Sequence, residues 1–146
     1  MDQRLRHIPI LRWFHFGDMH LAVARNSAAT MHPKPLEIIC LHCQQAVEKY
    51  LKGYLIAQSG GNPLKTYDLA ELCALCQGYE QSFVNLEAAC SRLTMYAAQT
   101  WYPDGIALEE TDMEYALGAA TKIKFFPFLA ELREKLEQEG SHEPNP

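Results

Sequence analysis

Residues 36–58 read LEIICLHCQQAVEKYLKGYLIAQ, and their pattern predicts the centre of the fold. Apolar side chains recur three or four positions apart, which is the spacing that aligns side chains along one face of a helix. This stripe contains Leu36, Cys40, Cys43, Val47, Tyr50, Tyr54 and Ala57, and it is widened by Ile39, Leu51 and Leu55. An apolar arc of that width is typical of a helix with neighbours on two sides, so we expect this segment in the middle of a bundle.

Helical patterns also flank the central segment. Before it, residues 10–28 carry an apolar face that ends in the proline-containing segment MHPKP. After it, the segment SGGNP stops the central helix, because glycine adopts left-handed conformations and proline cannot continue a helix. Asp68 followed by Glu71 then marks the start of a short helix, since both side chains can accept hydrogen bonds from amides of the first turn.

Two longer patterns complete the chain. Residues 81–100 carry an apolar helical face, and a capping box at Thr111 and Glu114 opens a fifth helix. Pro127 interrupts that last pattern, so we expect a kink or break there before a final helical stretch over residues 128–137. The sequence therefore predicts an all-α fold, an antiparallel bundle of four main helices plus one short helix, with the fifth long segment kinked near Pro127.

Length and composition indicate one domain without a membrane segment. The 146 residues include 13 Lys and Arg against 18 Asp and Glu, and this net charge of −5 argues against a broad basic face for duplex nucleic acid. No apolar run approaches the roughly 20 residues that span a bilayer, and the N-terminus lacks the pattern of a secretory signal. Five cysteines, an odd number, favour reduced thiols, so we expect a soluble cytoplasmic protein. We expect a single domain over residues 1–139 and a mobile tail over residues 140–146.

Four of the cysteines form two CxxC pairs, Cys40 with Cys43 and Cys73 with Cys76. Four thiolates could bind zinc tetrahedrally, and a CxxC pair near a helix N-terminus can act in redox chemistry. However, both pairs lie within helical patterns, where a spacing of three directs both thiols to the core as small hydrophobic groups. A cysteine-based zinc or redox protein is therefore an alternative rather than the main hypothesis.

The polar side chains of the central helix are the main candidates for a binding site. They are His42, Gln45, Glu48, Lys49 and Lys52. Lysine heads on such a face could meet a phosphate or an acidic partner, although a solvated helix face explains them equally well. His42 is either a histidine hydrogen-bonded to a neighbour or a group with acid–base chemistry.

These segments, taken in order, resemble the HEPN family (higher eukaryotes and prokaryotes nucleotide-binding domain) over about residues 13–128. The run LHCQQAVEKYLK, residues 41–52, is similar to the family's second-helix motif F-H-x-Q-Q-A-A-E-K-x-L-K. The segment TYDL, residues 66–69, is similar to the family's T-H-D-L, and Tyr96 followed by Tyr102-Pro-Asp104 is similar to its R-Y-P turn. The resemblance implies an antiparallel helical bundle, commonly a homodimer, that binds a nucleotide or RNA. It also implies a minimal nucleotidyltransferase as partner in a toxin–antitoxin-like pair.

Many family members are metal-independent RNases, but this sequence departs from their pattern. Those RNases carry an Arg, four to six residues and then a His near the turn after the long third helix, whereas the region from Arg92 to the turn contains no histidine. Arg25 and His32 have six residues between them, but at the end of the first helix. Trp101 replaces the arginine of R-Y-P, and Tyr67 replaces the histidine of T-H-D-L.

The resemblance and its departures together predict a non-catalytic binding module that needs no cofactor. An active metal-independent RNase is the alternative, and it would need His42 or His32 in place of the missing histidine. The predicted ligand- or partner-binding residues are His42, Gln45, Glu48, Lys49, Lys52, Asp68, Tyr102 and Asp104.

Overall fold

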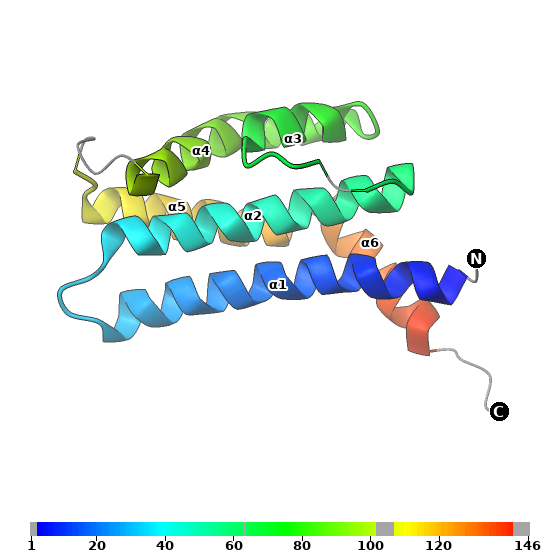
Figure 1. The fold of residues 1–146 in the computed structure, drawn as a ribbon, viewed down its shortest axis with the longest axis horizontal. Helices are drawn as coiled ribbons and strands as arrows, with labels where there is room; N and C mark the ends of the chain where they lie inside the picture. The colour runs from blue at the N-terminus through cyan, green and yellow to red at the C-terminus, as the bar shows by residue number, and fades with distance from the viewer. Residues whose placement is uncertain (1–2, 63, 102–106, 142–146) are drawn as a thin grey trace.

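The computed structural model describes residues 3–62, 64–101 and 107–141 of the chain, with side chains over residues 9–62, 64–97 and 107–140. The regular elements of this part are all helical (Figure 1). They are α1 (Gln3–Thr30), α2 (Leu36–Ser59), α3 (Leu69–Gln77), the 3-10 helix η1 (Gln81–Leu86), α4 (Glu87–Trp101), α5 (Glu110–Lys124) and α6 (Pro127–Ser141). The all-α prediction is therefore confirmed. No helix in the described part of the chain is both long enough and apolar enough to cross a bilayer.

Helix α2 lies at the centre of the bundle, as its wide apolar arc predicts. It runs antiparallel to α1, with α3 and α4 on its other side and α5 behind it (Figure 1). The side chains of its apolar stripe are buried from Ile39 to Tyr54. The helix ends where Gly60 adopts a left-handed conformation, with φ of 70°, and its N–H donates to the Ile56 carbonyl. This is the glycine stop that the sequence predicts.

Two glycines set the close approach of α1 and α2. A Cβ at Gly17 would lie 2.5 Å from Cε1 of Tyr50, and one at Gly53 would lie 2.8 Å from Cε1 of Phe14. Both distances are shorter than carbon atoms can approach, so each glycine makes room for the aromatic ring of the facing helix. The two contacts fix the register between the helices.

Helix α6 is tied to α1 by a half-buried polar cluster around Asp18. The Tyr50 hydroxyl donates to Oδ1 of Asp18 at 2.7 Å, and Arg133 donates from Nη1 at 3.1 Å and also from Nη2. Lys124 Nζ lies 3.4 Å from the same carboxylate. Burial raises the pKa of Asp18, but the hydrogen bonds from Arg133 and Tyr50 and the neighbouring cations lower it further, so its pKa is below the usual 3.8.

The starts of three helices, α1, α4 and α5, differ from the predicted ones. Helix α1 begins at Gln3 rather than at residue 10, with Pro9 inside it. The helix predicted over residues 81–100 begins as the 3-10 helix and becomes α4 at Glu87. Helix α5 begins at Glu110, and its capping box is formed by Glu109 and Asp112 rather than by Thr111 and Glu114. The break at Pro127 is confirmed, since α5 ends at Lys124 and Pro127 is the first residue of α6. At the first position of a helix the N–H makes no hydrogen bond within the helix, so a proline fits there without loss.

The C-terminal helix is also longer than the sequence predicts. Helix α6 continues to Ser141, past residue 137, and so includes two residues of the expected tail. The rest of that tail, residues 142–146, lies outside the described residues.

Candidate functional site

Two lysines of α2 share one carboxylate. Lys49 Nζ lies 3.1 Å and Lys52 Nζ 3.4 Å from Oε2 of Glu48. Glu48 and Lys52 are only 5% and 8% exposed, so most of this group is removed from water. One carboxylate cannot neutralise two ammonium groups, and the cluster therefore carries an excess positive charge.

The indole ring of Trp13 lies against both ammonium groups. Lys49 Nζ is 5.5 Å and Lys52 Nζ is 6.0 Å from the ring centroid. These distances are within the range of cation–π attraction, which adds to the hold of Glu48 on the two lysines. These four residues form one group, which we call the lysine–tryptophan cluster: Trp13 of α1 with Glu48, Lys49 and Lys52 of α2.

An open hollow of about 600 Å³ lies beside this cluster, between α1 and α2. It is lined by Pro9, Arg12, Trp13, Phe16 and Lys49. The Arg12 guanidinium lies 5.8 Å from the Phe16 ring centroid and Lys49 lies over Trp13, so each cation of the lining is paired with an aromatic ring. Cations bind phosphate or carboxylate groups, and aromatic rings stack on flat ligands such as nucleobases. The hollow therefore suits an anionic ligand that contains an aromatic ring.

A second, smaller hollow of about 240 Å³ lies at the C-terminal end of α2. Its lining is largely apolar, with Lys52 as its charged residue: Lys52, Leu55, Ile56, Ser59, Asn62, Leu64, Leu75 and Tyr79. Lys52 thus connects this hollow to the lysine–tryptophan cluster.

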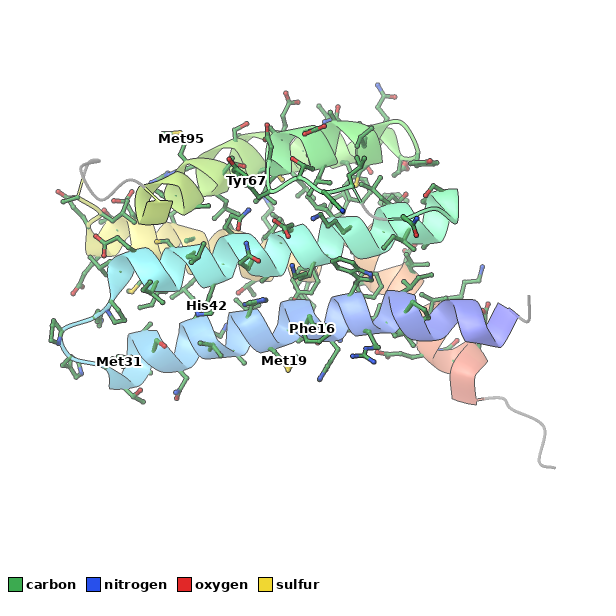
Figure 2. The ribbon with its side chains drawn as sticks, in the orientation of Figure 1. Phe16, Met19, Met31, His42, Tyr67 and Met95 are labelled. Atoms are coloured by element: carbon green, nitrogen blue, oxygen red, sulfur yellow. The ribbon has the colours of Figure 1, made fainter. Side chains whose placement is uncertain are left out.

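His42 faces α1, where it meets a second histidine. Figure 2 shows the His42 side chain projecting toward α1, and its Nδ1 lies 3.0 Å from Nδ1 of His20. Burial lowers the pKa of both imidazoles, and the charges of His42 and Lys49 lower that of His20 further, against an opposing effect of Glu48. Both rings are therefore neutral at pH 7, and one donates its Nδ1–H to the other. The interpretation of His42 as a histidine hydrogen-bonded to a neighbour fits this geometry, and His20 is a member of the site that sequence reasoning missed.

The structure assigns Gln45 and Asp68 local hydrogen-bonding roles. Gln45 donates to Oε1 of Gln44 at 2.8 Å, and the fully buried Gln44 donates to the Tyr67 carbonyl at 2.8 Å. Asp68 accepts from the amides of Ala70 at 3.0 Å and Glu71 at 3.4 Å, which makes it the N-cap of α3. Asp68 is therefore a helix cap in this structure. Glu48, Lys49 and Lys52 contact one another on α2, whereas His42 contacts His20 on α1.

Gln44 was not among the predicted site residues, although the sequence contains a signal for it. It follows Cys40 by four positions and precedes Val47 by three, which places it on the apolar stripe of α2. A polar residue on a buried stripe needs a hydrogen-bond partner, and the connection between α2 and α3 provides it.

The turn after α4 leaves two predicted residues untested, because Tyr102 and Asp104 lie outside the described residues. Arg92 of α4 donates from Nε to the Tyr96 hydroxyl at 2.6 Å, and the Tyr96 hydroxyl donates to Asp112 at 3.0 Å. The Arg92 guanidinium also lies 3.8 Å from the ring centroid of Tyr115. This arginine therefore ties α4 to α5.

The five cysteines are free and buried. Cys73 donates to the Phe83 carbonyl at 3.3 Å, and burial raises the pKa of Cys40 and Cys43 to about 12, so these last two are protonated thiols at neutral pH. Among the side chains that the structure describes, no group of three or more His, Cys, Asp and Glu is placed to hold a metal ion.

In the comparison with known proteins, one family model matches most of the chain. The model described as "HEPN domain" matches residues 12–126, which run from just before Trp13 to just before α6. A search of curated proteins and a search of solved structures gave no match.

Proposed function

Because the chain belongs to the HEPN domain family, we propose that it is a helical module that binds a nucleotide or RNA in the hollow between α1 and α2. The observation that carries this proposal is the lysine–tryptophan cluster, with its excess positive charge at the wall of an aromatic hollow. Phosphate oxygens would accept hydrogen bonds from Lys49 and Arg12. A base would stack on Trp13 or Phe16.

The burial of the cluster supports recognition rather than mere solubility. A surface lysine is mobile and well hydrated, whereas Lys52 is 8% exposed and both lysines are held by Glu48 and Trp13. Charges that are already ordered and partly desolvated lose less conformational entropy and less hydration when an anion binds. The overall net charge of −5 is compatible with this, because Arg12, Lys49 and Lys52 lie close together at this site and make the local charge positive.

Binding is tested by titrating the full chain with ATP and with a labelled single-stranded RNA. Lys49→Gln should weaken binding by about fivefold, which corresponds to about 1 kcal/mol for one charge at contact distance in water. Trp13→Leu should weaken RNA binding by a similar or larger factor, because stacking contributes about 1–3 kcal/mol per base. The matched control is Lys122→Gln, an exposed lysine on α5. Equal affinities of the Lys49→Gln and Lys122→Gln proteins, or no binding by the wild type, would refute the proposal.

A metal-independent RNase is the second candidate, and the His20–His42 pair is the observation that favours it. A neutral imidazole of this pair can accept a proton as a general base, and the imidazolium that forms can return that proton to the leaving group as a general acid. RNA cleavage in EDTA by the wild type, abolished by His42→Ala, would support this activity. Cleavage that persists in both His42→Ala and His32→Ala proteins would count against it.

We also propose a homodimer, which the family resemblance implies and which an exposed apolar stripe on α1 supports. The apolar arc of α2 is buried within one chain, whereas α1 exposes Met19 and Val23 one helical turn apart on a single face. Figure 2 shows Met19 on the side of α1 that faces away from α2. A C2 pair is the commonest way to cover such a stripe. Light scattering of the wild type and of Met19→Glu tests this, and a wild-type monomer at micromolar concentration contradicts it.

The family resemblance further supports a minimal nucleotidyltransferase as partner, in a toxin–antitoxin-like pair. Co-expression with the product of a neighbouring gene, followed by co-purification and nucleotide titration of the complex, tests this pairing. Failure of such a protein to co-purify with the intact chain would argue against it.

A further inference from the structure

The contact between His20 and His42 joins two different helices through the same type of nitrogen. Their Nδ1 atoms lie 3.0 Å apart, and their ring centroids are 5.2 Å apart with the rings tilted by 33°. Both residues are half-buried. One shared proton uses the lone pair of one nitrogen only, and each imidazole could instead direct an Nδ1 lone pair toward the same point between the rings.

We propose that His20 and His42 bind a divalent transition-metal ion of the nickel or copper type, which bridges α1 and α2. This inference does not depend on nucleotide binding, because it uses neither the lysine–tryptophan cluster nor the hollow beside it.

The distance between the two nitrogens selects the class of metal. Metal–nitrogen bonds of about 2.0–2.1 Å to two atoms 3.0 Å apart enclose an angle of about 90–97°. That is the angle between adjacent ligands in square-planar or octahedral coordination, which Cu²⁺ and Ni²⁺ favour. Tetrahedral Zn²⁺ needs a wider angle of about 109°, and the helices would have to separate slightly to provide it.

The scaffold holds this separation in place. Gly17, one turn before His20, packs against the Tyr50 ring, and the Tyr50 hydroxyl donates to Asp18. Helices fixed by such contacts cannot slide relative to each other without a clash, so the two imidazoles are preorganised.

The remaining coordination positions belong to water or to an incoming ligand. No third His, Cys, Asp or Glu in the described part of the chain joins the pair. A site with two protein ligands and several open positions binds metal more weakly than a closed structural site. Its open positions are available to water or to another exchangeable ligand.

The test is calorimetric titration of the untagged full chain with NiCl₂ and with ZnCl₂ at about pH 7.5 in a buffer that does not chelate metals. The informative variants are His20→Asn and His42→Asn, because the asparagine amide retains a hydrogen-bonding group near the Nδ1 position while being a poor ligand. His15→Asn is the matched control, since His15 is an exposed histidine on the same helix. Circular dichroism and the metal-free unfolding midpoint verify that each variant folds.

We expect the wild type to bind one Ni²⁺ per chain, more tightly than Zn²⁺. Each pair substitution should weaken Ni²⁺ binding by at least the roughly 10–100-fold that is typical when even an outer-shell partner is lost, while His15→Asn leaves it unchanged. Ni²⁺ should also raise the unfolding midpoint of the wild type and not that of either pair variant, because an ion that binds only the folded state stabilises it. Unchanged Ni²⁺ affinity in both pair variants, or no Ni²⁺ binding by the wild type, overturns the proposal. Preferential Zn²⁺ binding that is lost in Cys73→Ser also overturns it and points to the cysteines.

Discussion

Gly17 of α1 faces the ring of Tyr50 of α2 so closely that a methyl group on Gly17 would lie 2.5 Å from Cε1. The position is in the middle of a long helix, where glycine is normally unfavourable. The close packing of the two helices offsets this cost. The same contact brings Tyr50 to Asp18 and sets the register that pairs His20 with His42.

Gly17→Ala should lower the free energy of unfolding by about 1–3 kcal/mol, because the new methyl group forces the tightly packed helices apart. Gly118→Ala is the matched control, since Gly118 lies on the exposed side of α5 with nothing within 4 Å of an added Cβ. That change should instead raise stability by about 0.5–1 kcal/mol, the helix preference of alanine. Urea denaturation of both proteins measures the two changes in the free energy of unfolding, which should have opposite signs. A neutral or stabilising Gly17→Ala would contradict the packing argument.

Asp18 makes stability depend on pH at the acidic end. Its pKa is below 3.8 in the folded state, so as the pH falls the unfolded chain takes up the proton first. The stabilisation is complete above about pH 3.8 and is lost as the pH falls through the folded-state pKa. Asp18→Asn should reduce the free energy of unfolding by about 1–2 kcal/mol at pH 7 and by less near pH 3. Parallel urea titrations at the two pH values measure this, and a difference that does not shrink with falling pH contradicts it.

Glu48→Gln should separate stability from binding. The change removes the carboxylate that holds two ammonium groups, so the free energy of unfolding should fall by about 1–3 kcal/mol. The excess positive charge of the lysine–tryptophan cluster rises at the same time, so affinity for ATP or RNA should increase by up to about fivefold, with a steeper dependence on salt. Titrations at two salt concentrations measure both effects. Weaker binding by a folded Glu48→Gln protein would show that the carboxylate is itself part of the recognition.

Gln44→Leu tests the buried amide beneath the connection to α3. The substitution leaves the Tyr67 carbonyl without its donor and Gln45 without its acceptor, and should lower the free energy of unfolding by about 1–3 kcal/mol. Gln58→Leu, at the exposed end of α2, is the control and should lie within about 0.5 kcal/mol of the wild type. Thermal unfolding distinguishes the two proteins. Equal midpoints would mean that the buried hydrogen bond contributes nothing net.

The fold could be predicted from sequence because it depends on local periodicity. The stripe of α2, the glycine stop at Gly60 and the break at Pro127 are all patterns within a few residues of one another. The beginning of α1 at Gln3 could not be predicted from local pattern, because proline disfavours the helix interior and Pro9 is the seventh residue of this helix.

The site could be predicted only in part. The polar residues of α2 can be read from their spacing, but the pairing of His42 with His20 depends on how two helices align across 22 residues. Lys52 and Glu48, four apart, have the spacing of an ordinary surface ion pair, and only the packing of Trp13 over the lysines shows that they are nearly buried. Contacts of this kind follow from tertiary packing, and no local pattern encodes them.

The family match ends at residue 126, yet α6 contributes Leu129 and Leu136 to the core and Arg133 to Asp18. A fragment trimmed to the matched boundaries would therefore expose apolar surface and leave an aspartate without its strongest partner. Poor yield or aggregation of such a fragment would reflect this missing helix rather than any toxicity of the protein. Expression boundaries for related chains are better chosen from helix ends and charge pairs than from the limits of sequence similarity.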